Sequence, residues 1–92
     1  MSELNGITEL HEMLNIGLGF EKELKEVGIQ TPDDLRRIGS KEAYRRLKEA
    51  GVQNLNINKL ASLQGAIDNV KKYALSSESR EDIEEFYFEY EK

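Results

Sequence analysis

The chain has 92 residues, so it has material for one small hydrophobic core, and any function must lie on the surface of that core. It contains no cysteine, which excludes disulfides, thiolate nucleophiles and cysteine-based zinc sites, and no apolar run approaches the roughly 18 residues that a membrane helix needs. The net charge of −5 comes from residues 76–92, which hold seven acidic and two basic residues, so the rest of the chain is neutral overall.

Helix-forming residues and helix stop signals recur along the chain, whereas the alternating apolar runs typical of strands are missing. The clearest signal is "LKEVGIQ" at residues 24–30, which returns as "LKEAGVQ" at residues 47–53. A glycine in the left-handed conformation ends many helices, and the next residue then packs back onto the last turn. We therefore predict Schellman caps at Gly28 and Gly51, the first of them ending a helix over residues 18–27.

The following two helices have explicit boundaries. Thr31 is suited to cap the next helix, Pro32 to occupy its first position, and Asp34 to complete a capping box. Gly39 then ends that helix, and Ser40 is predicted to cap another over residues 41–50, whose remaining face is basic.

Two more helices are predicted after the Asn-rich turn "NLNIN". The first runs over residues 57–73, and Gly65 within it indicates close approach by a neighbouring helix. The serine-rich segment "SSES" then opens a last helix that directs Ile83, Phe86, Tyr87 and Tyr90 toward the core and Phe88 to the opposite side. The sequence therefore predicts an all-α, compact domain of five or six helices.

Signals of catalysis are weak throughout. His11 is the single histidine, and "HEMLN" has the His-Glu pair of a metalloprotease helix without the second histidine four residues later. No GxSxG elbow exists, and "NIGLG" is an incomplete dinucleotide-binding motif with no strand before it. We therefore expect no enzymatic activity, no cofactor, no metal and no small-molecule substrate.

The segment "NIGLG" is more typical of the turn in a helix-hairpin-helix motif, formed here by residues 14–17 before a helix that ends at Gly28. The ordered series "NIG", "LKEVGI", "TPDDL", "EAYRRLK", "LNINKLASLQGA" and a closing helix resembles the C-terminal domain of the TfoX/Sxy family over residues 8–87. The resemblance implies a helical fold with a helix-hairpin-helix-like motif. It also implies a role in regulating DNA uptake, because members of this family are positive regulators of competence genes. The expected domain is a single one over residues 1–92, with its core at about 8–90, in the cytoplasm and without membrane contact.

The first functional hypothesis is non-specific contact with the backbone of DNA. Glycines at a helix N-terminus let backbone N–H groups approach a phosphate, and basic side chains neutralise its charge. The residues expected to make this contact are Asn15, Gly17, Gly19, Lys22, Lys41, Arg45 and Lys48, the last three from the basic group Arg36, Arg37, Lys41, Arg45, Arg46 and Lys48. Two features oppose it: Asn15 stands where DNA-binding hairpins usually have glycine, and the helix after the hairpin has a net charge of −1.

The alternative hypothesis is a protein-interaction module without nucleic-acid binding. The segment "EFYFEY" holds four of the seven aromatic residues of the chain, more than one face of one helix can bury. Phe88 and Tyr90 are the residues expected at an interface with a protein partner or a second copy. In a third arrangement, the basic middle of one copy contacts the acidic tail of another and forms a salt-sensitive homodimer.

Overall fold

The computed structural model describes residues 7–91 and contains, within that range, five α-helices and two short 3₁₀ helices and no strand. The elements in chain order are η1 (Leu10–Glu12), α1 (Leu18–Glu26), α2 (Pro32–Ile38), α3 (Ser40–Glu49), α4 (Ile57–Asp68), η2 (Lys72–Ala74) and α5 (Ser77–Tyr90). The prediction of an all-α domain with five or six helices is confirmed. The turn at residues 14–17 follows the single turn η1 rather than a longer helix, so the helix-hairpin-helix motif stays a prediction. Within residues 7–91, every helix is too short or too polar to cross a bilayer.

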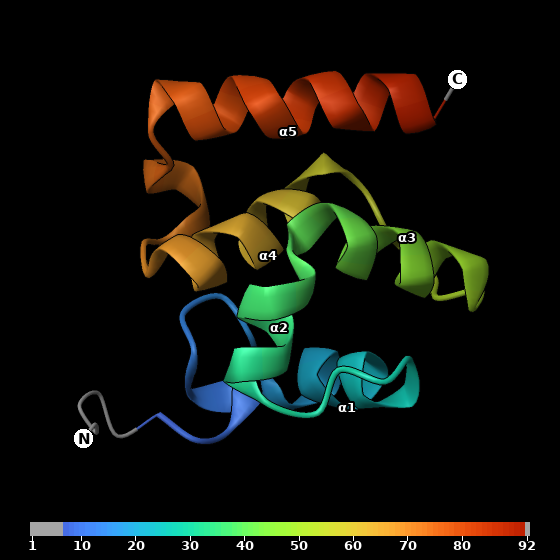
Figure 1. Cartoon of the computed structure of the whole chain (residues 1–92). Coiled ribbons are helices and arrows are strands. Elements are labelled where there is room, and N and C mark those ends of the chain that lie inside the picture. Colours follow the sequence, from blue (N-terminus) through green and yellow to red (C-terminus); the bar gives the residue numbers. More distant parts are fainter. Residues whose placement is uncertain (1–6, 92) are drawn as a thin grey trace.

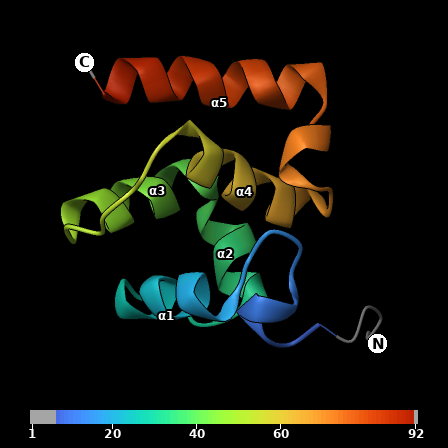
Figure 2. The ribbon, with the colours of Figure 1, turned by 180° about the vertical axis from the view of Figure 1, so that it is seen from behind.

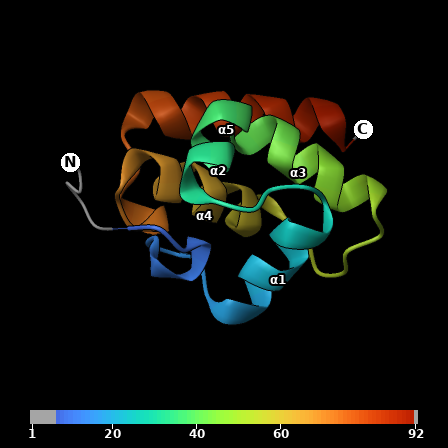
Figure 3. The same ribbon diagram turned by 60° about the horizontal axis from the view of Figure 1, so that its bottom comes forward.

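The helices pack in tiers around one core. Figures 1 and 2 show α5 along one side of α3 and α4, with α1 and η1 at the opposite side and α2 between them. With the bottom of the molecule turned forward, α2 lies in front of α4 and α1 lies at the lower edge of the view (Figure 3). Nearly every helix contributes a fully buried side chain to the core, namely Leu10, Leu24, Leu35, Tyr44, Leu47, Leu60, Leu63 and Ile83.

Both predicted Schellman caps are present. Gly28 and Gly51 have φ angles of 89° and 82°, which a side chain rarely adopts. The N–H of Ile29 donates to the Leu24 carbonyl at 3.0 Å, and the N–H of Val52 donates to the Leu47 carbonyl at 3.1 Å. The repeated sequence therefore forms the same C-terminal cap at the ends of two helices.

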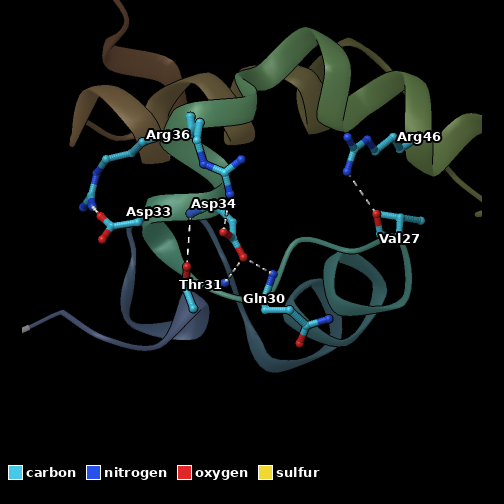
Figure 4. A network of polar contacts seen from close by, with 8 residues as sticks. Val27, Gln30, Thr31, Asp33, Asp34, Arg36 and Arg46 are labelled. Atoms are coloured by element: carbon cyan, nitrogen blue, oxygen red, sulfur yellow. Dashed lines mark hydrogen bonds and ion pairs between the residues drawn. The ribbon is translucent and has the colours of Figure 1, made fainter.

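The start of α2 is also as predicted (Figure 4). The Thr31 hydroxyl accepts from the N–H of Asp34 at 3.1 Å, and the Asp34 carboxylate accepts from the N–H groups of Thr31 and Gln30 at 3.2 and 3.0 Å. The Gln30 N–H is the largest influence that lowers the pKa of Asp34, followed by Arg37. The capping box thus fixes the charge of this carboxylate as well as the helix boundary.

The predicted cap at Ser40 is wrong. Gly39, with φ of 90°, ends α2 and is also the N-cap of α3, so Ser40 is the first residue of that helix. The Ser40 side chain is buried, and its hydroxyl donates to Oε1 of Gln64 on α4 at 2.6 Å. Packing between α3 and α4 therefore takes the hydroxyl away from the helix end.

The long predicted helix over residues 57–73 is shorter than expected. Asn69 adopts the left-handed conformation with φ of 60° and ends α4 at Asp68, after which η2 forms separately. The close approach at Gly65 is confirmed, but its two nearest neighbours are loop residues, and Lys72 at the start of η2 comes third at 3.4 Å. A Cβ on Gly65 would lie 2.5 Å from Nδ2 of Asn15 and 2.6 Å from the Val70 carbonyl oxygen. Gly65 leaves room for a loop side chain.

The face that α5 turns to the core is the predicted one. Ile83 is fully buried, and the rings of Phe86, Tyr87 and Tyr90 surround the Tyr44 ring edge-on, with centroids 6.1–6.4 Å apart. Phe88 points away from this cluster and is 66% exposed. Aromatic packing on Tyr44 therefore holds α5 against α3.

Candidate functional site

The six basic side chains of residues 36–48 are all paired with carboxylates of the same chain. The pairs of the four arginines lie within α2 or within α3, three or four residues apart in sequence. Lys41 pairs instead with a residue of α5, and Lys48 with the C-cap of α5. The full set is Arg36–Asp33 (Figure 4), Arg37–Asp34, Lys41–Asp82, Arg45–Glu42, Arg45–Glu49, Arg46–Glu42 and Lys48–Glu91. The local positive charge that the sequence indicates is therefore offset within the fold.

Glu42 is the centre of the α3 part of these pairs. Its carboxylate accepts from Arg45 at 2.7 Å and from Arg46 at 3.1 Å, and these two guanidinium groups lower the pKa of Glu42 to about 2. Arg46 also donates to the Val27 carbonyl at 3.4 Å, which links α3 to the end of α1 (Figure 4). Arg45 and Arg46 are thus committed to contacts inside the domain.

Two lysines connect α3 to the acidic C-terminal helix. Lys41 Nζ lies 2.7 Å from Asp82, and Lys48 Nζ lies 2.8 Å from Glu91. Lys48 lowers the pKa of Glu91, which keeps this carboxylate ionised. The basic middle and the acidic tail were predicted to attract each other between two copies of the chain. In this structure, these ion pairs form within one chain.

Asn15 has a structural use in this fold. It is left-handed, with φ of 72°, and its side chain bonds to backbone groups that are far away in sequence. Nδ2 donates to the Val70 carbonyl at 3.0 Å and the Ser62 carbonyl at 3.4 Å, and Oδ1 accepts from the N–H of Lys72 at 3.0 Å. Asn15 therefore joins the hairpin turn to α4 and to the segment that follows it.

A pocket of about 380 Å³ opens beside Asn15, between the N-terminal ends of α1 and α4 and the start of η2. We call it the lysine pocket. Lys59 Nζ lies 4.4 Å from the centre of the Phe20 ring, a cation–π contact, and neither Lys59 nor Lys72 has an ion pair within residues 7–91. The lining contains no carboxylate and consists of Asn15, Gly17, Phe20, Asn56, Asn58, Lys59, Ser62 and Lys72.

The N-terminus of α1 adds backbone donors to the lysine pocket. Gly17 is the N-cap and has no side chain to occupy the free N–H groups of the first turn. Gly17 and Gly19 are both exposed, and no atom lies within 4 Å of where a Cβ would be at either. An anion in this pocket would meet two lysines and the positive end of a helix.

The structure separates the residues predicted to contact phosphate into three sets. Asn15 and Gly17 line the lysine pocket, with Gly19 in the adjacent helical turn, and Lys22 is exposed on α1 without an ion pair in the described residues. Lys41, Arg45 and Lys48 lie in the ion-paired set instead. Sequence reasoning missed Lys59 and Lys72, because nothing in the sequence indicates that residues so far from the hairpin meet it.

Comparisons with known proteins agree with this architecture. The family model described as the TfoX C-terminal domain matches residues 7–87, and no curated protein matches the chain. An uncharacterised protein from Listeria monocytogenes, solved in a triclinic crystal form, is 32% identical in sequence to this chain and superposes with a TM-score of 0.83. The match covers 89% of this chain and 92% of that chain. A protein of unknown function from the same organism, solved in a tetragonal form, is 31% identical with a TM-score of 0.81, and the match covers 88% of this chain and 98% of that chain. The chain belongs to the TfoX C-terminal domain family.

Proposed function

We propose that this domain is a non-enzymatic binding domain with a regulatory role, and that its lysine pocket contacts phosphates of a nucleic-acid backbone. The observation that carries the proposal is the charge of the pocket. In a chain with 18 acidic residues, the pocket is lined by two lysines without ion pairs and by no carboxylate. The regulatory part of the proposal follows from family membership, which suggests genes for DNA uptake as the target.

The proposal moves the contact from the basic group to the lysine pocket. Lys41, Arg45 and Lys48 each lie 2.7–2.8 Å from a carboxylate of the same chain, so the charge that a phosphate would meet at these residues is largely neutralised. Lys59 and Lys72 have no ion pair of this kind within residues 7–91, so their charges are available to a phosphate. The free N–H groups at the start of α1 add hydrogen-bond donors to the pocket. Because the whole chain carries −5, we expect weak binding that is strongly reduced by salt.

The test compares two double variants that remove the same charge from different surfaces. Lys59→Ala with Lys72→Ala is expected to lower the affinity for duplex DNA about tenfold, and to reduce the slope of log affinity against log salt by about 2. Lys41→Ala with Arg45→Ala is expected to leave both quantities nearly unchanged. Fluorescence anisotropy with a labelled duplex, titrated at several salt concentrations, measures both.

The matched variant makes the result specific, because both changes reduce the net charge equally. Circular dichroism checks that each variant is folded. Equal losses in the two variants would assign the effect to net charge rather than to the pocket. No binding by the unmodified protein at low salt would reject nucleic-acid contact altogether.

The exposed ring of Phe88 favours a second function, a protein interface on α5. This side chain is 66% exposed at the outer surface of the helix, 5.7 Å from the centre of the Tyr87 ring. Glu85 and Glu81, one and two turns before it, are also exposed. Tyr90, the other predicted interface residue, is half-buried and stacks on Phe86. It therefore contributes to the packing of α5 on the core rather than to the exposed face of the helix.

Mass in solution tests this second function through self-association. We expect a mass above the 10.6 kDa of the monomer at high protein concentration, and the monomer mass for Phe88→Asp. Tyr73→Asp is the control, because Tyr73 is 72% exposed on a different element, and it should behave as the unmodified chain. A monomer at every concentration would argue against a homodimer through α5.

A further inference from the structure

A cluster of three metal-ligating side chains lies where η1 packs against α1, and none of the three lines the lysine pocket. Glu9, His11 and Glu21 each offer one donor atom, and these atoms lie within 4.8 Å of one another. Glu9 and His11 flank the start of η1, and Glu21 is in the first turns of α1. We propose that these three residues bind one divalent transition-metal ion, Zn²⁺ rather than Mg²⁺, that fastens η1 to α1.

The distances between donors suit a metal without a rearrangement of the backbone. Nδ1 of His11 lies 3.2 Å from Oε1 and 3.1 Å from Oε2 of Glu21. Metal bonds of about 2.1 Å in a tetrahedral site place adjacent donors about 3.4 Å apart, so an ion would replace the hydrogen bond between His11 and Glu21 with only a slight separation of the pair and would draw in the third donor, which lies within 4.8 Å. Glu9 is exposed and is the N-cap of η1, where its side chain accepts from the backbone N–H of Glu12, so it would exchange this capping bond for the metal as the third ligand.

Hydrogen bonding orients the buried carboxylate of this cluster. Glu21 is 8% exposed, and its Oε2 accepts from the backbone N–H of His11 at 3.0 Å. This bond holds the carboxylate with both oxygens toward the imidazole, and Oε1 accepts no backbone hydrogen bond within residues 7–91, so it is the oxygen available to an ion, as the outer hydrogen bonds of a metal site orient a ligand. Glu21 is the one charged residue among the buried side chains of residues 7–91, and a cation would compensate its charge in a partly dry setting.

Charge and donor type select the class of ion. Two carboxylates and one imidazole are attractive to a cation, and within residues 7–91 none of the three forms an ion pair with lysine or arginine. One nitrogen and two oxygen donors suit Zn²⁺ or Co²⁺, whereas Mg²⁺ and Ca²⁺ prefer oxygen alone. The exposed side of His11 and Glu9 leaves a path for entry and a position for water.

The spacing of these residues explains why the sequence predicts no metal site. His11 and Glu21 are ten residues apart and lie on different elements, so they match no short ligand motif. Only the packing of η1 against α1 brings them together. The proposal does not depend on the lysine pocket, and either can fail without the other.

Titration of the untagged, metal-free full chain tests the site. We expect one equivalent of Zn²⁺ to bind by calorimetry, Co²⁺ to give the visible absorption of a low-coordinate site, and Mg²⁺ to give no signal. A hundredfold excess of Zn²⁺ over its Kd should raise Tm by about 10 °C or more. His11→Gln and Glu9→Gln should each weaken Zn²⁺ binding by about tenfold or more, because each removes one ligand.

The control is Glu23→Gln, which removes a carboxylate from the same helix outside the cluster and should leave the affinity unchanged. His11→Gln and Glu9→Gln keep the backbone N–H that holds Glu21, so both are expected to fold, as circular dichroism will check. No saturable binding of Zn²⁺ would overturn the proposal. Binding that Glu23→Gln weakens as much as Glu9→Gln would overturn it as well.

Discussion

Tyr44→Ala is expected to destabilise the domain by about 3–5 kcal/mol, the usual cost of removing a large aromatic side chain from a core. Tyr44 is fully buried, and its ring is the contact for three rings of α5. Its hydroxyl donates to Oε2 of Glu91 at 3.0 Å, and burial and this bond raise the pKa of Tyr44, so the hydroxyl stays protonated. Urea unfolding followed by circular dichroism measures the loss.

Two controls separate the contributions to this effect. Tyr44→Phe keeps the ring and removes only the hydrogen bond to Glu91, so we expect a cost of about 1 kcal/mol. Tyr73→Ala removes the same side chain from a site that is 72% exposed, where the change should be within about 0.5 kcal/mol. A loss below about 1 kcal/mol for Tyr44→Ala would mean that the aromatic cluster does not hold α5.

Asn15→Ala is expected to cost about 2–4 kcal/mol of unfolding free energy. The change leaves the part-buried Val70 carbonyl without its partner, at about 1–3 kcal/mol, and removes the bond to the exposed Lys72 N–H, which water can replace at a smaller cost. It also places alanine at φ of 72°, a conformation that asparagine tolerates better. Thermal and urea unfolding measure the total.

Variants at Asn15 distinguish structural support from contact with a ligand. Asn15→Gly removes the same hydrogen bonds without the backbone strain, so it should cost less than Asn15→Ala. Asn58→Ala changes another residue of the lysine pocket whose side chain forms no such bridge, and it should leave stability nearly unchanged. A stable Asn15→Ala that loses DNA binding would instead assign this residue a direct contact with phosphate.

Local signals account for the boundaries that could be predicted. The cap at Gly28 depends on bonds within five residues, between Ile29 and Leu24, and the capping box of Thr31 and Asp34 spans three. These bonds form between neighbours in the chain, so residue type and spacing are enough to specify them. The end of α4 at Asn69 was missed because asparagine takes a left-handed position less often than glycine does.

The candidate site was only partly predictable. The turn with Gly17 is apparent in its own sequence, whereas Lys59 and Lys72 come to lie beside it through contacts that span more than 40 residues. The basic group was correctly located on α2 and α3, but its ion pairs with Asp82 and Glu91 depend on where α5 packs. A count of charges along the chain cannot show which of them neutralise one another.

The sequence by itself determined the helical class, most helix ends, the family and the inward face of α5, because these depend on periodicity and on bonds between close neighbours. Only the tertiary structure decided which charges remain unpaired, that Asn15 supports α4, and that Glu9, His11 and Glu21 meet. The physical reason is the distance along the chain between the residues that interact. A cap is complete within one turn of helix, whereas a pocket or an ion pair between helices exists only after the core has fixed the positions of distant segments.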